Sequence, residues 1–334
     1  MKAITYSKYG APDVVAFAEV AKPVPKHNEV LIRIHATTVT TGDWRARSLK
    51  LPGGFGFLGR PVFGIFAPRQ PILGTELAGV IESVGRAVTR FRVGDEVFAF
   101  PGGSFGCHAE YRTLAEAGMI ALKPTNLSFE EAAALSFGGT TALPFLRDKA
   151  GIKRGDKVLV VGASGGVGTA AVQIAKHFGA DVTGVCSAAN SDLVRSIGAD
   201  RVIDYGKEDF ASIGETWDII LDTTGTAPFS RCERALKPGG RLIVVLASLA
   251  EAMGLKRPSK ASGKTVIAGV AAISPDDLRY LAKLAEAGEF MPVIDRSYPL
   301  EHAAQAHAYV DTGRKRGNVV LTVGSARAQY QIAA

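Results

Sequence analysis

Cysteine is scarce in this sequence. Its 334 residues include three, Cys107, Cys186 and Cys232, and no two of them have Cys-x-x-Cys spacing. A disulfide framework and a four-thiolate zinc lobe are therefore both excluded. Such cysteine usage is typical of reduced, intracellular proteins, so we expect a cytoplasmic location.

Long apolar runs and secretory features are missing as well. No run of about 18 apolar residues occurs, so the sequence predicts no membrane span, and we expect no membrane partner. Residues 1–6 alternate like a strand and lack the apolar core and cleavage site of a secretory signal. No export is implied.

Charge of one sign is not clustered, although the net charge is +7. The densest basic runs, residues 256–257 and 314–316, are short. A face that binds nucleic acid needs clustered positive charge, so we do not expect a nucleic-acid partner.

The first 125 residues are divided by Gly and Pro into short stretches that predict a small, mostly antiparallel barrel. The stretch between Ser48 and Pro71 is rich in Phe and has no clear periodicity, and we predict a long loop there. Three hypotheses for it stay open: a wall of a substrate pocket, a contact with a neighbouring subunit, or packing on its own barrel. The expected strands are residues 2–6, 15–19, 29–40, 73–83, 96–99 and 108–113.

From Asn126 onward the pattern changes to alternating strands and helices, which is typical of a parallel sheet. Ser128 with Glu131 three residues later predicts the start of a helix, and Ser274 predicts another. Six parallel strands are expected at residues 157–161, 181–186, 201–204, 217–222, 241–246 and 265–270. The expected helices are residues 168–178, 190–197, 228–236 and 278–287, with a turn at 238–240 and a last strand at 317–323.

The apolar strand 157–161 runs directly into a glycine-rich turn, residues 162–168. Ala163, Gly165 and Gly168 occupy the three positions of the dinucleotide fingerprint, with alanine at the first. The second position lets the backbone approach a pyrophosphate, and the following helix directs its free N–H groups at the phosphates. Because a second strand ends about 20 residues later, the context is that of a dinucleotide site. We predict that its turn residues are Ala163, Ser164, Gly165, Gly166 and Val167.

The end of the second strand predicts which dinucleotide is bound. Proteins that bind NAD place an acidic residue there, on the ribose 2′-hydroxyl, whereas this chain has Ser187. Ser187, Asn190 and Tyr205 can donate hydrogen bonds to a 2′-phosphate, although Ala189 stands where Lys or Arg would be the stronger partner. We therefore predict NADPH (NADP+ when oxidised) rather than NADH. A half-buried tyrosine at a strand end is the structural alternative for Tyr205.

Several motifs together resemble the medium-chain dehydrogenase/reductase superfamily, in its zinc-free quinone oxidoreductase-like branch. They are residues 74–81, 93–97, 109–111, 163–168, 198–200 and 317–320. The resemblance implies an α/β protein with a GroES-like β-barrel catalytic domain, residues 1–125 and 273–334, and a Rossmann doubly wound cofactor domain, residues 126–272. It also implies a homodimer.

Two positions at which zinc-dependent members carry Cys and His are occupied here by Thr40 and Thr75. Hydroxyl groups are poor zinc ligands, so we expect no metal. The resemblance then implies direct hydride transfer to an electrophilic small molecule, a quinone or an activated alkene such as an enone or 2-alkenal. Alcohol or aldehyde dehydrogenase activity is a weaker alternative because no Lewis acid would polarise the oxygen.

Candidates for hydrogen bonds to the developing oxyanion are Thr40 and Asp43. Each has a structural alternative, a strand-end threonine and a helix cap. By the same resemblance, Thr140 and Asn318 lie near the nicotinamide ribose or pyrophosphate, and Ala247, Ser248 and Leu249 border the nicotinamide. A function from a different class stays open, a non-catalytic NADPH-binding redox sensor or RNA-binding protein.

Overall fold

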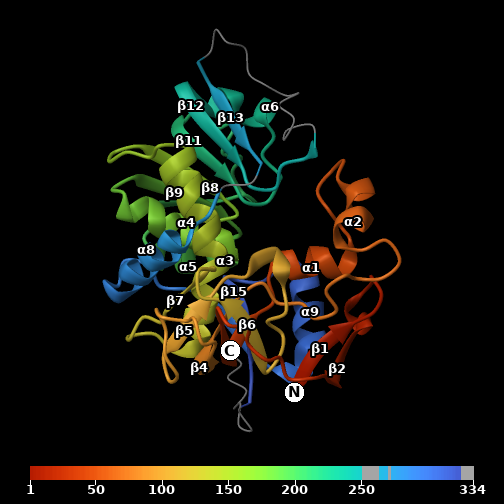
Figure 1. The fold of residues 1–334 in the computed structure, drawn as a ribbon. Helices are drawn as coiled ribbons and strands as arrows, with labels where there is room; N and C mark the ends of the chain where they lie inside the picture. Colours follow the sequence, from red (N-terminus) through yellow and green to blue (C-terminus); the bar gives the residue numbers. More distant parts are fainter. Residues whose placement is uncertain (250–262, 270–271, 325–334) are drawn as a thin grey trace. The chain divides into compact units, whose positions relative to one another are not determined.

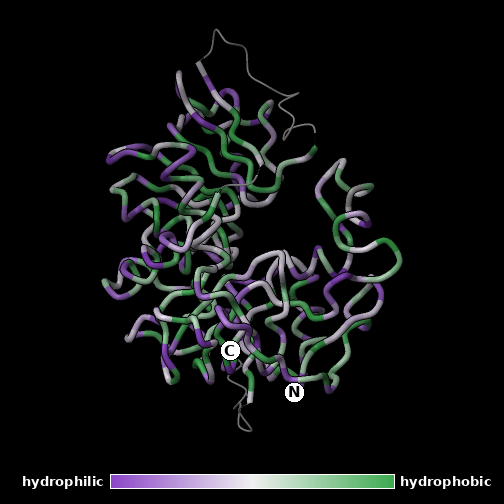
Figure 2. Tube along the Cα trace, viewed as in Figure 1, coloured by the Kyte–Doolittle hydropathy of each residue, from purple (hydrophilic) through white to green (hydrophobic). Residues whose placement is uncertain are grey.

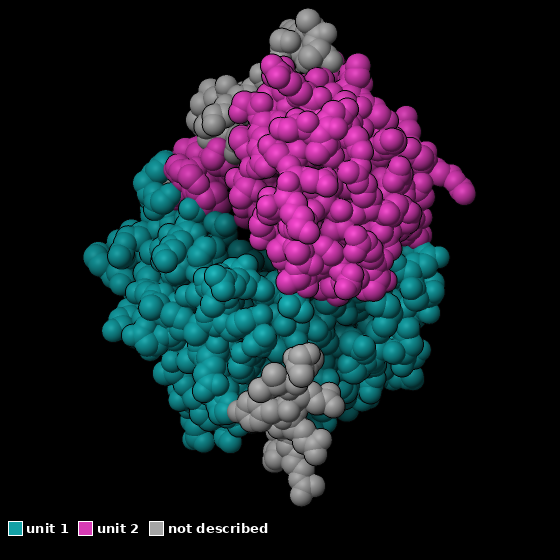
Figure 3. Space-filling model, turned by 180° about the vertical axis from the view of Figure 1, so that it is seen from behind, with its two compact units in different colours: residues 1–51, 56–137, 274–334 teal, residues 52–55, 138–273 magenta. Residues whose placement is uncertain are grey.

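The computed structural model describes residues 1–249, 263–269 and 272–324, and it divides the chain into two units (Figure 3). Unit 1 comprises Met1–Leu51, Gly56–Phe137 and Ser274–Ala334, and unit 2 comprises Pro52–Phe55 and Gly138–Ile273. The chain passes from unit 1 to unit 2 at Phe137, within a helix, whereas the predicted domain boundary is residue 126. The assignment of catalytic and cofactor domains stays a prediction.

Unit 1 is built around a seven-stranded sheet in which β14 and β15 pair in parallel and the other pairs are antiparallel (Figure 1). Its path is β14-β15-β3-β4-β5-β7, and β6 also pairs with β3. A separate hairpin joins β1 (Lys2–Tyr6) and β2 (Val15–Glu19). The larger sheet contains β3 (Glu29–Thr38), β4 (Leu77–Val84), β5 (Glu96–Ala99), β6 (Tyr111–Ala115), β7 (Ile120–Leu122), β14 (Ile294–Pro299) and β15 (Asn318–Thr322).

Helices complete unit 1, and its core is made of alternate apolar residues from the strands together with residues of one helix near the C-terminus. That helix, α9, supplies Ala303, Ala306 and Val310 to the same cluster as Ile32 of β3 and Leu321 of β15. The helices are α1 (Thr41–Ser48), α2 (Gly56–Phe63), α8 (Pro275–Glu286), α9 (Ala303–Asp311) and the first part of α3 (Phe129–Pro144). The rest of α3, from Gly138, belongs to unit 2 and continues as a π-helical turn at Phe145–Lys149. None of the helices in the described part of the chain is long and apolar enough to cross a bilayer.

Unit 2 contains a six-stranded, fully parallel sheet of order β10-β9-β8-β11-β12-β13. Counted along the chain this order is 3-2-1-4-5-6, the doubly wound order in which ligands bind beyond the carboxyl ends of the strands, where the order reverses. The strands are β8 (Lys157–Val161), β9 (Asp181–Cys186), β10 (Arg201–Asp204), β11 (Trp217–Asp222), β12 (Leu236–Val244) and β13 (Thr265–Ala268). The helices are α4 (Gly166–His177), α5 (Ser191–Ser196) and α6 (Phe229–Cys232).

The predicted six-strand parallel sheet is confirmed, and β8, β9, β10 and β11 have the predicted bounds. The predicted helix 228–236 is confirmed over residues 229–235, where α6 is followed by a 3-10 turn at Glu233–Ala235. The predicted turn 238–240 is wrong, because these residues lie within β12, which begins at Leu236. The pairing of β12 with β11 jumps from Leu236–Trp217 to Arg241–Ile219, so the Pro-Gly-Gly sequence forms an irregularity inside the strand. The predicted 48–71 loop is wrong in part, since it contains α2. Residue 270 of the last predicted strand lies outside the described residues.

Candidate functional site

The glycine-rich turn connects β8 to α4 at the carboxyl end of the sheet. Gly162 has φ +80°, a left-handed conformation that favours glycine, and the N–H groups of Gly162 and Ala163 both donate to Val185 O at 3.0 Å. A Cβ on Gly168 would lie 2.1 Å from Gly162 O, so no side chain fits there. The turn is therefore held to the neighbouring strand β9, and its third glycine is required by helix-to-strand packing.

Gly165 differs from these two glycines because neither its backbone conformation nor the packing around it requires a glycine. It has an extended backbone, with φ −81° and ψ 172°, and a Cβ placed on it would be 3.5 Å from Gly162 O, an ordinary contact. It is also the N-cap of α4, where it supplies no side chain to satisfy the first N–H groups of the helix. Open space therefore lies beside a set of free N–H groups at a positive helix end, which fits a pyrophosphate.

Polar residues beyond β9 and β10 gather beside this turn. Asn190 Nδ2 donates to Ser164 Oγ at 3.0 Å, which ties the segment after β9 to the turn. Tyr205 directly follows β10, and its N–H donates to O of Cys186, the last residue of β9, at 3.1 Å. Tyr205 therefore lies beside the end of β9, where Ser187 follows. The Tyr205 side chain is 66% exposed. The half-buried alternative is wrong, and the phenol is available to a ligand.

The loop after β11 also belongs to this edge, and none of the sequence motifs above includes it. Asp222 is buried, and its carboxyl oxygens accept hydrogen bonds from the N–H groups of Thr224, Gly225 and Ala227 at 2.8–3.0 Å. Thr223 Oγ1 donates to Val161 O at 2.8 Å. The loop thus packs on the glycine turn, where Thr224 stands against Gly162. An acidic residue that ends a buried strand next to the glycine-bearing strand was the available signal.

Helix α3 runs close to the start of α4. A Cβ on Gly138 would lie 2.5 Å from Gly166 O, so the two helices approach at their backbones. Thr140, two residues further along α3, is buried in this part of unit 2. Unit 2 also holds Ala247, which is buried, and Ser248 and Leu249; the N–H of Leu249 donates to Gly53 O at 2.9 Å.

In unit 1 a buried polar cluster forms where β3 ends and α1 begins. Thr40 is the N-cap of α1, and Asp43 accepts from the Thr40 N–H at 2.8 Å and the Thr40 hydroxyl at 2.6 Å through Oδ2. Its other oxygen, Oδ1, accepts from the Gly74 N–H at 2.8 Å. Both oxygens of Asp43 are therefore bonded within the protein. The helix-cap alternative for Asp43 is present in the structure.

Thr75 extends this cluster, because its Oγ1 lies 3.1 Å from Thr40 Oγ1. A threonine hydroxyl has one proton to donate, and the short bond to Asp43 uses that of Thr40. The Thr75 hydroxyl can then donate its hydrogen bond either to Thr40 Oγ1 or to a ligand oxygen. Thr75, rather than Thr40, is the hydroxyl of this pair that can donate outward.

Next to Thr75, Glu76 is a fully buried carboxyl group. It accepts hydrogen bonds from the Thr38 hydroxyl and from the Phe137 N–H in α3. Burial raises the pKa of Glu76 to about 8, against these two hydrogen bonds, which lower it. The positive charge of Lys315 also lowers the pKa of Glu76, and burial lowers the pKa of that lysine to about 8.

Asn318, the first residue of β15, is also buried in unit 1. Its side-chain amide donates to Val293 O at 3.1 Å, and its N–H donates to the same oxygen at 2.8 Å. The amide oxygen of Asn318 remains as an acceptor. The predicted site residues therefore fall into a unit 2 group around the glycine turn and a unit 1 group, Thr40, Asp43 and Asn318.

The residues at the two predicted zinc-ligand positions do not fit zinc. Thr40 and Thr75 face each other with hydroxyl groups, whereas zinc sites in proteins use thiolate, imidazole or carboxylate ligands. The nearby His108 ring pairs through Nε2 with Thr38 O at 2.9 Å. Within residues 1–249, 263–269 and 272–324, no three His, Cys, Asp or Glu side chains lie together as metal ligands would.

Comparison with known proteins agrees with this architecture. Residues 26–125 match the family described as "Alcohol dehydrogenase GroES-like domain" and residues 197–321 that described as "Zinc-binding dehydrogenase". The 2-methylene-furan-3-one reductase of Solanum lycopersicum is 36% identical over 333 residues, which cover 96% of this chain and 79% of that protein. The chloroplastic NADPH-dependent alkenal/one oxidoreductase of Arabidopsis thaliana is 32% identical over 333 residues, with the same coverage of 96% and 79%.

A solved structure gives the same result for the whole chain. The quinone oxidoreductase from Coxiella burnetii matches with a TM-score of 0.85 at 28% identity, covering 97% of this chain and 99% of that one. The predicted combination of a GroES-like domain with a Rossmann sheet is confirmed. The chain belongs to the medium-chain dehydrogenase/reductase superfamily of pyridine nucleotide-binding oxidoreductases, in its quinone oxidoreductase-like branch.

Proposed function

We propose that this protein is an NADPH-dependent reductase that transfers hydride, without a metal ion, to quinones or to the activated double bond of enones and 2-alkenals. The observation that carries the proposal is Gly165, a glycine required by neither the backbone nor the packing, beside the free N–H groups of α4. Relatives named as quinone and alkenal/one oxidoreductases support the choice of acceptor. The hydroxyl pair Thr40 and Thr75 supports the absence of zinc.

NADPH supplies the hydride when bound, and the chain binds and orients it. The N–H groups of Gly166 and Val167, with Ala163, Ser164 and Gly165, hold the pyrophosphate. Ser187, Asn190 and Tyr205 receive the 2′-phosphate, which the exposed Tyr205 phenol supports. Thr140, Asn318 and residues 247–249 border the nicotinamide end.

The acceptor needs hydrogen bonds that strengthen as negative charge develops on its oxygen. We assign the donating role to Thr75, with Thr40 and Asp43 as positioning residues that hold the Thr75 hydroxyl in place. As the acceptor oxygen becomes an oxyanion, it competes with Thr40 for the Thr75 proton. Thr40 and Thr75 are both buried, which limits the access of water to this bond.

The activity is tested with purified protein by following NADPH absorbance, which falls when quinones, 2-alkenals or aldehydes are reduced and rises when alcohols are oxidised by added NADP+. We expect turnover with quinones or alkenals and none with alcohols. Silence across this panel of compounds together with tight NADPH binding would contradict the proposal and favour a non-catalytic sensor. Comparable turnover with NADPH and NADH at equal, subsaturating concentration would contradict the cofactor assignment.

The hydroxyl pair is tested by substitution. We expect Thr40→Val and Thr75→Val each to lower kcat several-fold with the Kd of NADPH unchanged, because an acceptor hydrogen bond and its support are lost. Thr75→Ser keeps the hydroxyl and should retain most of the rate. An unchanged rate in Thr75→Val would remove this residue from the reaction.

We also propose a homodimer in the cytoplasm, from the family and from the cysteine usage. Light scattering of the purified protein gives its mass in solution, and microscopy of a tagged chain gives its location. A monomeric mass would overturn the first proposal, and an organellar signal the second.

A further inference from the structure

Residues 56–70, which we call the α2 segment, form a helix and a turn with two different faces. The inner face is fixed to unit 1: Phe63 packs against its core, 6.3 Å from Phe105 between ring centroids, and Gly64 O accepts the Tyr9 hydroxyl at 2.9 Å. Packing on its own barrel, one of the three hypotheses for this stretch, therefore accounts for Phe63. It does not account for the outer face.

The outer face carries large apolar side chains in solvent. Phe57 is 69% exposed, Val62 59%, Ile65 54% and Phe66 95%. The α2 segment lies beyond α1, away from the strands of the seven-stranded sheet (Figure 1), and the hydropathy colouring marks apolar residues along it (Figure 2). A cluster of exposed apolar residues of this kind marks a binding surface.

The charged side chains of the stretch that carries the outer face have one sign. Between Trp44 and Thr75 the sequence has five Lys or Arg residues and no Asp or Glu. Arg47 is used within unit 1, where it pairs with Asp311. Lys50, Arg60 and Arg69 are exposed. The surface is therefore apolar and cationic, and its partner must be apolar and anionic.

We propose that the outer face of the α2 segment binds the surface of an anionic lipid bilayer. The apolar side chains enter the boundary between headgroups and acyl chains, and Lys50, Arg60 and Arg69 meet the headgroup phosphates. The expectation of no membrane partner followed from the lack of a spanning run, but contact with a bilayer surface requires no span.

The observations favour a bilayer over a protein partner. In a two-fold contact between copies of this chain, the same patch faces itself, and Arg60 and Arg69 would meet like charges. A side chain as exposed as that of Phe66 needs a matching pocket in a protein partner, whereas acyl chains rearrange around it. An anionic bilayer accommodates both features, because its acyl chains surround the protruding apolar groups and its headgroup phosphates pair with the cations.

The test is sedimentation of the full-length protein with large unilamellar vesicles of phosphatidylcholine, alone or with about one quarter phosphatidylglycerol. We expect binding to the anionic vesicles, weaker binding to the neutral ones, and a loss of affinity as salt rises, since exposed charges are screened. Absence of sedimentation with the anionic vesicles would overturn the proposal.

Variants identify the surface. Phe57→Ser with Phe66→Ser, and separately Arg60→Gln with Arg69→Gln, should each weaken vesicle binding by about tenfold or more. Thermal unfolding verifies that the variants fold, as expected for exposed positions. The matched controls should bind like the parent: Val24→Ser with Val93→Ser for exposed apolar residues, and Lys26→Gln with Arg86→Gln for exposed cations.

Two outcomes contradict this surface specifically. If a control pair weakens binding as much as its matched pair in the α2 segment, vesicle binding is non-specific. If the parent self-associates and Phe57→Ser with Phe66→Ser abolishes this without any effect on vesicle binding, the patch belongs to a second copy of the chain.

Discussion

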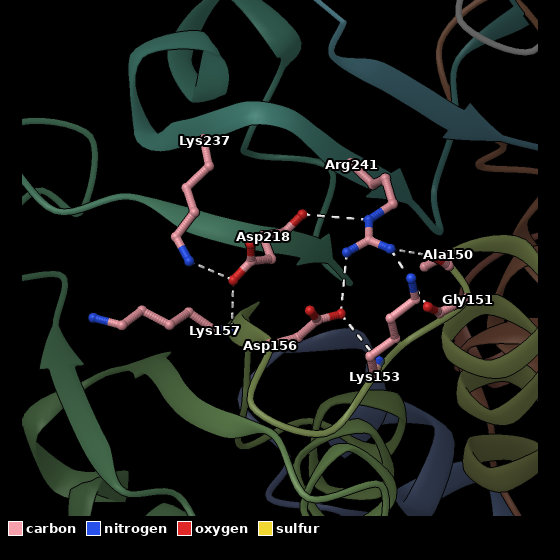
Figure 4. Close-up of polar contacts among 8 residues, drawn as sticks. All are labelled: Ala150, Gly151, Lys153, Asp156, Lys157, Asp218, Lys237 and Arg241. Atoms are coloured by element: carbon pink, nitrogen blue, oxygen red, sulfur yellow. Dashed lines mark hydrogen bonds and ion pairs between the residues drawn. The ribbon is translucent and has the colours of Figure 1, made fainter.

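The two edges of the parallel sheet in unit 2, at the amino and carboxyl ends of its strands, differ in how their polar groups are paired. At the amino-terminal edge, charged side chains are paired with one another and with the backbone (Figure 4). Arg241 donates to Asp156 at 3.1 Å and to Ala150 O at 2.6 Å, and Asp218 accepts from Lys237 Nζ at 2.6 Å and from the Lys157 N–H at 2.8 Å. These groups are satisfied by the chain itself, so this edge contributes stability.

At the carboxyl-terminal edge, the backbone around Gly165 is left open. Asp222 there uses both carboxyl oxygens to hold a loop, and the loop packs on the glycine turn. The first N–H groups of α4 have no side-chain cap from Gly165. One edge is therefore closed by charge pairs, and the other leaves backbone N–H groups open to a ligand. We therefore expect substitutions at the first edge to change the free energy of unfolding, and substitutions at the second to change the Kd of NADPH.

The largest effect is expected from Gly168→Ala, which should lower both stability and cofactor binding. The added Cβ would lie 2.1 Å from Gly162 O, so the turn must shift, at a cost of about 1–3 kcal/mol or more in the free energy of unfolding. We expect a lower Tm and a loss of NADPH binding together. A variant with the parent's Tm and Kd would show that the turn adapts easily.

Gly165→Val should separate the two properties. The Cβ meets the protein only at 3.5 Å, so we expect a nearly unchanged Tm, whereas the side chain fills the space next to the N–H groups and raises the Kd of NADPH about tenfold or more. Thermal unfolding without cofactor and titration with NADPH measure the two effects. If affinity is unchanged, the pyrophosphate does not lie at Gly165.

Arg241→Met should affect stability alone. It leaves Asp156 and the carbonyl of Ala150 without their main partner, which costs about 1–3 kcal/mol in the free energy of unfolding, while the Kd of NADPH stays as in the parent. Denaturant unfolding measures the cost. The matched control Arg279→Met breaks an exposed pair with Asp276 and should cost less than about 1 kcal/mol. Equal costs would mean that the edge pairs are no more important than surface pairs.

The smallest effect concerns pH. Burial opposes ionisation of Asp218, but the Lys237 ammonium and the Lys157 N–H prevail and lower its pKa. A carboxyl group with a lowered folded-state pKa adds stability above its unfolded pKa, about 3.9, and loses it as pH falls further. Asp218→Asn should therefore lie below the parent in Tm at neutral pH, and this difference should shrink as pH falls below about 4. A constant difference in Tm across this range would contradict the assignment.

The sequence predicted those parts of the fold that local pattern determines. β8 and β11 are apolar runs buried on both faces, and Ser274 begins α8 with the capping box that its spacing indicates. The α2 helix was missed because Gly56, Gly59 and Pro61 oppose a helix locally, and packing of Phe63 on unit 1 outweighs them. β12 was misplaced because Pro238 and the two glycines are tolerated as an irregularity within a strand.

The candidate site contains both residues that a local motif indicates and contacts that only the structure reveals. The residues of the glycine turn follow from a contiguous motif, so their location could be predicted. The contacts of Thr40 with Thr75 and of Thr223 with Val161 join residues 35 and 62 positions apart, and no local pattern encodes them. The assignment of the donor hydroxyl to Thr75 depends on the bond from Thr40 to Asp43, which requires atomic distances.

The pairing of β15 with β3 also affects the order in which the chain folds. Val320 lies opposite Thr38, so two strands separated by most of the chain are neighbours in the sheet of unit 1, and Val319 and Leu321 belong to its core. The strands of unit 2, in contrast, all lie between Lys157 and Ala268. During synthesis the sheet of unit 2 can form first. The backbone groups of β3 that pair with β15 remain unpaired until β15 has been synthesised. Chaperones that protect β3 during this interval would therefore be expected to affect yield more than those that act on unit 2.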